Sequence, residues 1–254
     1  MIREDGSTQL VLVRHGETTG KSSIRYFGRT DVELSELGRA QMRAAASWLA
    51  AKTGVTSFAP VFASPLKRAS EGARIIAGAM SATVTIDEFV EVDFGLFEGL
   101  TADEIRARHP LEFARWNDNR LADGYAYPGG ESRAAFTARV ERGVERMLAV
   151  LDGAVASAPS GADATAPYRA PVPAPSGAGT GALVSASHGS RVVPHSPAIA
   201  LVVAHRGVIR AITRRLAGAE PEIELGSIQV LSRADRRAGW RADLLDATEH
   251  LRGL

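Results

Sequence analysis

One stretch decides the fold of this chain: Leu10-Val11-Leu12-Val13-Arg14-His15-Gly16-Glu17-Thr18. Its four consecutive aliphatic residues lack a helical period and predict a buried strand, and Gly16 marks the turn where the chain leaves the sheet. Arg14 and His15 therefore stand at the carboxyl end of that strand. Ligands bind at this edge of open α/β sheets, because loops form a crevice there and helix N-termini point into it. An isolated Arg-His pair could equally be an exposed charge and a hydrogen-bonded turn residue, so the rest of the chain has to decide its role.

A later stretch repeats this arrangement. Residues 198–204 form a predicted buried strand that ends in His205-Arg206-Gly207 and leads into a helix predicted over 208–216. A second imidazole is therefore expected at the same edge of the sheet.

A third stretch adds another cation. Residues 61–63 predict a short buried strand, and Ser64-Pro65 fits the N-cap and first position of the helix that follows. Arg68 falls in the first turn of that helix. It is either a solvated helix charge or a second guanidinium at the same edge as Arg14.

The remaining patterns complete an alternation of helices and strands that is typical of an α/β domain. We expect helices over 35–53, 101–109, 111–120 and 131–151, and strands over 83–86, 226–231 and 240–245. Residues 153–197 differ, because they are dominated by Ala, Pro, Gly and Ser and have no regular period. We interpret them as a flexible insertion in a single domain that spans residues 1–254. His188 and His195 lie in this insertion and are expected to be exposed rather than catalytic.

The composition is that of a globular protein and excludes several classes of function. The chain has 254 residues, 45% hydrophobic and 23% charged, and 30 basic residues against 29 acidic ones leave a net charge of +1. This balance does not favour binding of nucleic acid or membranes through bulk charge, so any anion site must be local. The absence of cysteine excludes disulfides and thiolate nucleophiles. The polar N-terminus is unlike a secretory signal and no segment is long enough to span a membrane, so we expect a cytoplasmic location. The sequence does not indicate an oligomeric state.

The groups at the predicted sheet edge suit phosphoryl transfer. Two guanidiniums, Arg14 and Arg68, can chelate a phosphoryl group through fork-like hydrogen bonds. One neutral imidazole can attack phosphorus and hold a phosphohistidine, while a second imidazole stabilises the negative charge. A carboxylic acid can protonate the departing alkoxide and then activate water. Glu91, in the acidic connection 88–99, is the candidate for this last role.

Together these pieces resemble the histidine phosphatase superfamily, which includes the cofactor-dependent phosphoglycerate mutases. The similarity begins at Leu12-Val13-Arg14-His15-Gly16-Glu17-Thr18 and covers nearly the whole chain apart from the insertion. Its further blocks are residues 25–38, 64–69, 91–95, 128–132 and 205–210. The resemblance implies a three-layer α/β/α fold of the phosphoglycerate mutase type with a mostly parallel central sheet. It also implies that no metal and no obligatory redox cofactor takes part.

The resemblance implies a role for each site residue. It gives the role of phosphorylated nucleophile to His15 and that of proton donor to Glu91. The residues expected to bind the phosphoryl group are Arg14, Arg68 and His205. The residues expected to contact the rest of the substrate are Thr18, Lys21, Phe27, Gly28, Arg29 and Arg206.

Two of these residues depart from the family pattern. Lys21 stands where many members have asparagine, so a charge replaces a neutral amide. Arg206 follows the second histidine directly, where many members have glycine, and points either to the substrate or to solvent. Neither departure removes a group that the chemistry requires.

Within the superfamily the sequence favours hydrolysis over mutase chemistry. Phe27 and Phe94 stand where mutases tend to carry threonine and tyrosine. The residues around Tyr26-Phe27-Gly28-Arg29, Trp116 and 128–131 are similar to those of alpha-ribazole-phosphate phosphatases. We therefore expect a phosphomonoesterase acting on a small metabolite such as alpha-ribazole 5'-phosphate or a sugar phosphate. Two alternatives stay open: a cofactor-dependent phosphoglycerate mutase and a non-catalytic module that binds a phospho-ligand.

Overall fold

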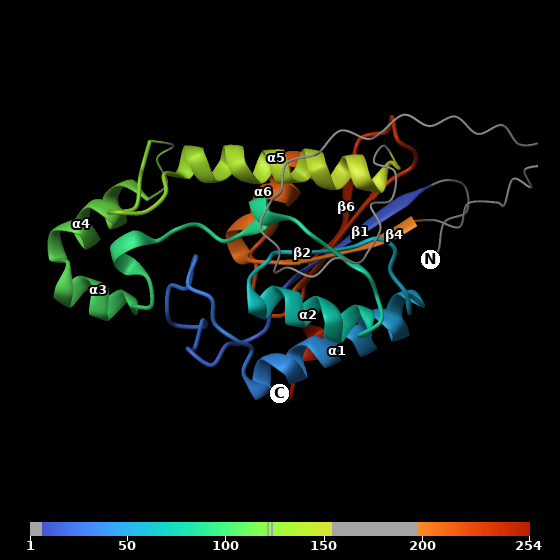
Figure 1. The fold of residues 1–254 in the computed structure, drawn as a ribbon, viewed down its shortest axis with the longest axis horizontal. Helices are drawn as coiled ribbons and strands as arrows, with labels where there is room; N and C mark the ends of the chain where they lie inside the picture. The colour runs from blue at the N-terminus through green and yellow to red at the C-terminus, as the bar shows by residue number, and fades with distance from the viewer. Residues whose placement is uncertain (1–6, 121, 123, 154–197) are drawn as a thin grey trace, which may run out of the picture.

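A six-stranded sheet lies at the centre of the computed structural model, which describes residues 7–120, 122, 124–153 and 198–254 (Figure 1). The strands are β1 (Thr8–Arg14), β2 (Val61–Ala63), β3 (Thr83–Thr85), β4 (Ala198–Ala204), β5 (Ile228–Arg233) and β6 (Arg241–Ala247). Their order in the sheet is β3-β2-β4-β1-β5-β6. Strands β1 to β4 are parallel, whereas β5 pairs antiparallel with β1 and β6 pairs antiparallel with β5. The expectation of a mostly parallel sheet is confirmed.

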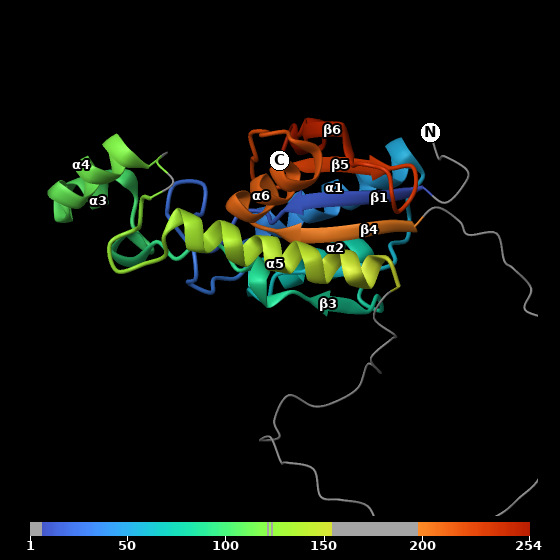
Figure 2. The ribbon, with the colours of Figure 1, turned by 90° about the horizontal axis from the view of Figure 1, so that it is seen from above.

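Helices cover both faces of the sheet and make three layers (Figures 1 and 2). On one face lie α1 (Glu36–Thr53) and α2 (Lys67–Ala77), and on the other lie α5 (Arg133–Leu151) and α6 (Arg206–Ala217). Side chains alternate along β1, so that Val11 and Val13 pack with α1 and α2 while Leu10 and Leu12 pack with α5 and α6. Because both faces are covered, β1 is apolar throughout, as its sequence predicted.

Two further helices, α3 (Ala102–Arg108) and α4 (Pro110–Asn119), stand beside the three layers rather than on them (Figure 1). Thr101 begins α3 with a capping box, because its side chain accepts from the N–H of Glu104 and its own N–H donates to the Glu104 carboxylate. We call residues 101–132 the cap. The cap joins the loop after β1 through the bidentate pair of Arg25 with Glu104. Three short 3₁₀ helices, η1 (Asp87–Phe89), η2 (Gly95–Phe97) and η3 (Glu249–Leu251), lie in the connections.

The register of the sheet brings the predicted site residues together. Arg14 pairs with Ala204 across β1 and β4, and Ala63 pairs with Val203 across β2 and β4. The N–H of His15 continues this ladder by donating to the Ala204 carbonyl, at 3.0 Å. The ends of three parallel strands therefore deliver their next residues to one edge.

Several boundaries differ from the sequence prediction. Helix α2 begins at Lys67 with Leu66 as its N-cap, so the prediction that Ser64-Pro65 starts this helix is wrong. The Ser64 hydroxyl is used elsewhere, since it accepts from the N–H of Leu66 and contacts His205. Helix α6 begins at Arg206, two residues before its predicted start, and β5 and β6 end later than predicted.

The predicted flexible insertion lies almost wholly outside the described residues, as do His188 and His195. Residues before and after it, in α5 and β4, continue the domain on both sides. In the part of the chain that the structure describes, every helix is too short or too polar to cross a membrane.

Candidate active site

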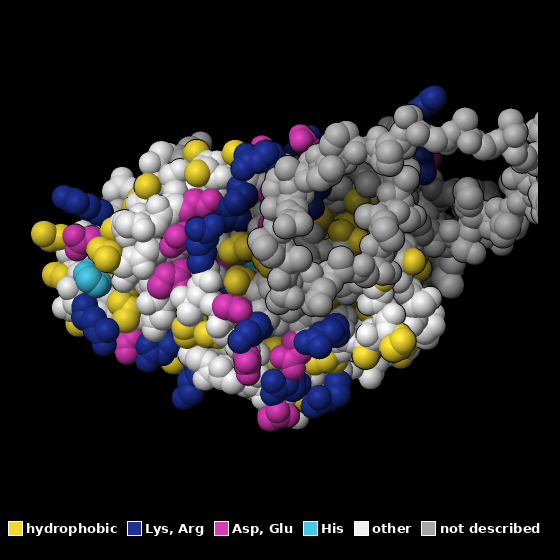
Figure 3. All heavy atoms as spheres, viewed as in Figure 1, with side chains coloured by type: hydrophobic (Ala, Val, Ile, Leu, Met, Phe, Trp, Pro, Cys, Tyr) yellow, Lys and Arg dark blue, Asp and Glu magenta, His cyan; other side chains and the backbone are white. Residues whose placement is uncertain are grey.

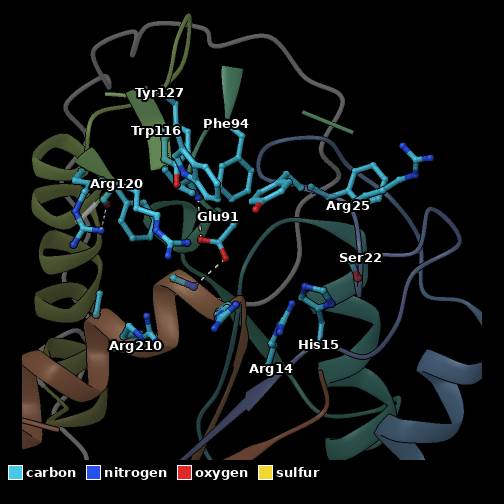
Figure 4. A pocket seen from close by; sticks show the side chains of 18 of the residues that line it. Arg14, His15, Ser22, Arg25, Glu91, Phe94, Trp116, Arg120, Tyr127 and Arg210 are labelled. Carbon is cyan, nitrogen blue, oxygen red and sulfur yellow. Dashed lines mark hydrogen bonds between the residues drawn. The ribbon is translucent and has the colours of Figure 1, made fainter. Parts of the chain in front are cut away.

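A cavity of about 490 Å³ opens at the carboxyl edge of the sheet (Figure 4). Its base is formed by Arg14 and His15 at the end of β1, and one wall is formed by the start of α6. The opposite wall comes from the loop after β1, from the segment that follows Glu91 and from the cap. The volume is that of a small-molecule site and exceeds what a phosphoryl group alone would fill.

His15 is buried at the end of β1, and two contacts define its tautomer. Its Nδ1 lies 2.8 Å from the carbonyl oxygen of Gly16, which can only accept, so Nδ1 carries the proton. Its Nε2 lies 3.3 Å from Nε of Arg68, which can only donate, so Nε2 carries the lone pair. The ring therefore holds an unprotonated Nε2 beside a guanidinium, as a nucleophile requires.

Burial keeps both imidazoles of the site neutral. It lowers the pKa of His15 well below the ordinary value of 6.5, and the positive charges of Arg68 and Arg14 lower this pKa further. Burial and the charge of Arg68 likewise lower the pKa of His205 well below 6.5. The two rings stand edge to face with their centroids 5.1 Å apart. A proton on either ring would place another cation in an already cationic cluster.

His205 is held between the ends of β2 and β4. Its Nε2 lies 2.8 Å from the hydroxyl oxygen of Ser64, and that oxygen also accepts from the N–H of Leu66. The Ser64 hydroxyl can donate its own proton to Nε2, which leaves the ring proton of His205 on Nδ1. Among the described residues, this buried Nδ1 has no hydrogen-bond partner. An unpartnered donor is thus present on the ring that stands beside His15.

The two arginines of the base differ in how many donors they leave free. Arg14 donates from Nη1 to the carbonyl of Ile223 at 2.8 Å, and its buried Nε has no partner in the described part of the chain. Burial lowers the pKa of Arg14 to about 10, which still leaves it charged near neutral pH.

Arg68 is fully buried and mostly committed to the protein. Its Nη2 donates to the carbonyls of Phe27 and Gly28, its Nη1 donates to the carbonyl of Thr30, and its Nε faces His15. Arg68 does not line the cavity, so its fork is not open for the chelation that the sequence suggested. It holds the loop after β1 and reaches the site through Nε.

Glu91 enters the cavity from the wall opposite β1. Figure 4 shows its carboxylate pointing into the space above Arg14 and His15. The carboxylate is buried and accepts from the main-chain N–H groups of Val92 and Gly207, each at 3.0 Å. A Cβ at position 207 would lie 2.5 Å from Oε1 of Glu91, so only glycine lets α6 approach this closely.

The main chain around Glu91 is fixed by Arg139 of α5, a residue that sequence reasoning missed. Its Nη1 donates to the carbonyls of Glu88 and Val90 at 2.7 and 2.8 Å. Its Nε and Nη2 form a bidentate pair with Glu131 at 3.0 and 2.7 Å. No local sequence signal marks Arg139, because its partners lie on a distant connection.

A family model places this constellation among known proteins: that of the histidine phosphatase superfamily (branch 1) matches residues 10–157. The chain belongs to the histidine phosphatase superfamily. The resemblance of the sequence motifs to this superfamily is thereby confirmed.

Curated relatives match part of the chain. A bifunctional protein of Mycobacterium tuberculosis is 40% identical over 149 residues, which are 58% of this chain and 39% of that protein. The chain thus spans about two fifths of the length of the first curated relatives that it matches.

Two solved structures share the fold. Mycobacterial glucosyl-3-phosphoglycerate phosphatase, in complex with inorganic phosphate, has a TM-score of 0.64 and 26% identity, covering 96% of this chain and 99% of its own. Alpha-ribazole phosphatase of Shigella flexneri has a TM-score of 0.67 and 20% identity, covering 94% of this chain and 96% of its own. The likeness at 20% identity shows the fold alone.

For this histidine phosphatase superfamily member, the structure brings together the five residues expected to carry the chemistry. Arg14, His15 and Glu91 line the cavity, and Arg68 and His205 lie buried behind them. Two of the six residues expected to contact the substrate, Phe27 and Arg206, also line the cavity, whereas the other four are not among its lining residues.

Those four residues have structural partners instead. Thr18 is buried and its hydroxyl accepts from the N–H of Ser22. The N–H of Gly28 donates to the carboxylate of Glu98, which gathers the loop after β1. Exposed Arg29 lies 3.9 Å from the carboxylate of Asp93. The expected substrate contacts of these residues stay predictions.

Lys21 is exposed and has a positive φ of 62°. Asparagine tolerates this left-handed region better than most residues, which gives a conformational reason for the asparagine that many members have here. The turn depends on this backbone conformation more than on the side chain.

Sequence reasoning singled out Tyr26, Phe94 and Trp116 without assigning them a contact, and it missed the rest of the cavity wall. Besides Phe27, its aromatic residues are Tyr26, Phe94, Trp116, Tyr127 and Phe136, and its additional arginines are Arg25, Arg120, Arg133, Arg210 and Arg214. A spacing of four residues along α6 could have shown that its arginines share a face. Among the described residues, no group of three or more His, Asp or Glu side chains is placed to hold a metal ion.

Proposed function

We propose that the chain is a phosphomonoester hydrolase that acts on a small phosphorylated metabolite through a phosphohistidine at His15. The observation that carries this proposal is the tautomer of His15, whose lone pair at Nε2 lies within the cationic base of the cavity. A structural histidine needs no such arrangement, whereas a nucleophile that attacks phosphorus does.

In the first step, the lone pair of His15 Nε2 attacks phosphorus and the bond from phosphorus to the ester oxygen breaks. Once Nε2 is bonded to phosphorus, the Nε–H of Arg68 loses its acceptor and can donate to a phosphoryl oxygen instead. Arg14 Nε and His205 Nδ1, both buried and unpartnered in the described part of the chain, supply two further donors.

Glu91 serves the leaving group and then the water. In its acid form it gives a proton to the departing alkoxide, and in its carboxylate form it accepts a proton from the attacking water. That water forms a bond to phosphorus, the phosphorus–nitrogen bond breaks, and the electron pair returns to Nε2 as inorganic phosphate leaves. The main-chain N–H groups of Val92 and Gly207 hold the carboxylate of Glu91 in one place during both steps.

Hydrolysis rather than mutase chemistry is supported by the wall of the cavity. Phe27 and Phe94 both line it, at the positions where mutases tend to carry threonine and tyrosine. The structural relative at 26% identity is also named as a phosphatase, glucosyl-3-phosphoglycerate phosphatase.

The test is the replacement His15→Asn, which keeps a side-chain N–H for the Gly16 carbonyl but removes the nucleophile. We expect a loss of at least about 1000-fold in p-nitrophenyl phosphate hydrolysis, as is usual when a nucleophile is removed. Wild-type protein quenched during turnover should also carry an acid-labile phosphate that the variant lacks. Unchanged turnover in a folded variant would refute the assignment, and conversion of 3- to 2-phosphoglycerate dependent on 2,3-bisphosphoglycerate would establish the mutase instead.

A further inference from the structure

The cavity carries far more positive charge than one phosphoryl group needs. Of the described residues that line it, seven are arginines and one, Glu91, is an acid. The arginines are Arg14, Arg25, Arg120, Arg133, Arg206, Arg210 and Arg214. Since the whole chain has a net charge of +1, this is a local concentration of charge. Figure 3 shows a band of Lys and Arg side chains on this face, between the cap and the centre of the molecule.

Most of these arginines are accounted for by the protein itself. Arg14 belongs to the base, and Arg25 forms a bidentate pair with Glu104. The three arginines of α6 lie near carboxylates of the connection to β5, with Arg206 and Arg210 at 2.9 and 3.6 Å from Glu222 and Arg214 at 3.5 Å from Glu220.

Arg120 and Arg133 are different, because neither has a carboxylate within 4.0 Å among the described residues. The two are neighbours, since Nη1 of Arg133 donates to the main-chain carbonyl of Arg120 at 2.9 Å. The Nε of Arg133 is buried and lacks a partner in the described part of the chain. Within the described part of the chain neither guanidinium is neutralised by a carboxylate, so both can contribute charge to the binding of an anion in the cavity.

Aromatic rings separate this pair from the base of the cavity. Trp116 stacks beneath the guanidinium of Arg120 at 5.1 Å and meets the ring of Tyr26 edge to face. Figure 4 shows Trp116, Tyr127 and Phe94 side by side on the cap side of the cavity, above Glu91. Such a wall suits a flat apolar body rather than a second charged group.

We propose that the substrate carries a second anionic group, a carboxylate or a phosphate, which Arg120 and Arg133 bind while a planar ring of the substrate lies against Trp116 and Tyr127. The inference rests on the proposed function, because the first anionic group is the phosphate that His15 attacks. The substrate class is thus a phosphomonoester that carries a planar ring and a distal negative charge.

Matched esters test this inference. We compare 4-carboxyphenyl phosphate with its neutral isostere 4-carbamoylphenyl phosphate, and include 1,4-phenylene bisphosphate to distinguish a carboxylate from a phosphate. The same set on a biphenyl scaffold covers a longer distance between the two groups. We expect kcat/KM to be at least about tenfold higher for one anionic ester than for its neutral partner, which is the effect of one charge-assisted hydrogen bond.

The double variant Arg120→Gln/Arg133→Gln should lose that preference, so that the ratio of kcat/KM for the anionic ester to kcat/KM for the neutral ester falls to about one. The control is Arg115→Gln, an exposed arginine of α4 that does not line the cavity, which should keep the preference. Equal kcat/KM for anionic and neutral esters on both scaffolds, in a wild-type protein that hydrolyses them, would overturn the inference and leave the proposed function intact.

A binding measurement, which needs no turnover, distinguishes failure of the proposed distal site from failure of the proposed function. The non-hydrolysable pair 4-carboxybenzylphosphonate and 4-carbamoylbenzylphosphonate, with its biphenyl counterparts, reports on the distal site through calorimetric Kd values alone. A protein that hydrolyses no ester but binds an anionic phosphonate at least about tenfold more tightly contradicts the proposed function and supports the distal site. Equal Kd values across the pairs contradict the distal site.

Discussion

The base of the cavity is built from strand ends and buried side chains, whereas the cap is built from two short helices that pack through aromatic rings. At the base, fully buried Arg68 donates to three main-chain carbonyls and to His15. In the cap, α4 contributes no buried residue, and Trp116 packs against Phe97 and Phe113. The geometry of the base depends on hydrogen bonds to main-chain carbonyls, which are present whatever the side chains are. The packing of the cap depends on its side chains.

This difference separates chemistry from specificity. A nucleophile and its donors must hold their positions closely, and hydrogen bonds to main-chain atoms of a central sheet provide that. A substrate wall only has to offer a complementary surface, and side chains on short peripheral helices can change without disturbing the sheet. We therefore expect changes at the base to affect the chemical step and changes in the cap to affect the choice of substrate.

The largest effect in this comparison is expected from Glu91→Gln, which keeps the size of the side chain but removes the proton. Loss of a general acid should lower kcat/KM by about 100- to 10,000-fold for an alkyl phosphate, whose leaving group needs a proton. The loss should be much smaller for p-nitrophenyl phosphate, whose leaving group departs without one. Glu88→Gln is the matched control, because this carboxylate pairs with Arg146 and does not line the cavity. Equal losses of kcat/KM on both esters would show that Glu91 is not the general acid.

A smaller effect is expected from Arg139→Gln, which removes the hydrogen bonds to the carbonyls of Glu88 and Val90. Displacement of Glu91 by a fraction of an ångström to one ångström should lower kcat/KM for an alkyl phosphate by up to about 100-fold. The readout is again the pair of leaving groups: a positioning role predicts the pattern of Glu91→Gln in weaker form, with little change in KM. Equal loss on both esters would show instead that Arg139 only stabilises the fold.

The smallest expected effect is a dependence of stability on pH, which arises from the two buried histidines of the base. Burial lowers the pKa of His15 and His205 well below 6.5, so the unfolded chain binds protons at these rings before the folded chain does. Stability should therefore fall as the pH drops below about 6.5, by at most about 1.4 kcal/mol per ring and per pH unit. Thermal melts at pH 7.5 and 5.5 should show a smaller decrease in Tm for His205→Gln than for wild type. An equal or larger decrease in Tm for His205→Gln would contradict the picture of a neutral buried base.

The edge of the sheet was predictable because its signals are local. Four aliphatic residues before Arg14, and the similar run before His205, mark buried parallel strands, and parallel strands place their carboxyl ends at one edge. The start of α2 was not predictable in the same way. Serine is a residue type that often caps a helix, but the hydroxyl of Ser64 contacts Nε2 of His205 at the end of the neighbouring strand. The helix therefore starts later.

The chain by itself determined its α/β architecture, its superfamily and the five residues predicted to carry the chemistry, because each of these lies in a short segment with its own period or motif. Only the tertiary structure decided the tautomer of His15, the commitment of Arg68 to loop carbonyls, and the support of Glu91 by Arg139. It also decided the pairing of the arginines in the cavity wall. The physical reason is that such features depend on hydrogen bonds and charges between segments far apart in the chain, and no local pattern of residues records which segments meet.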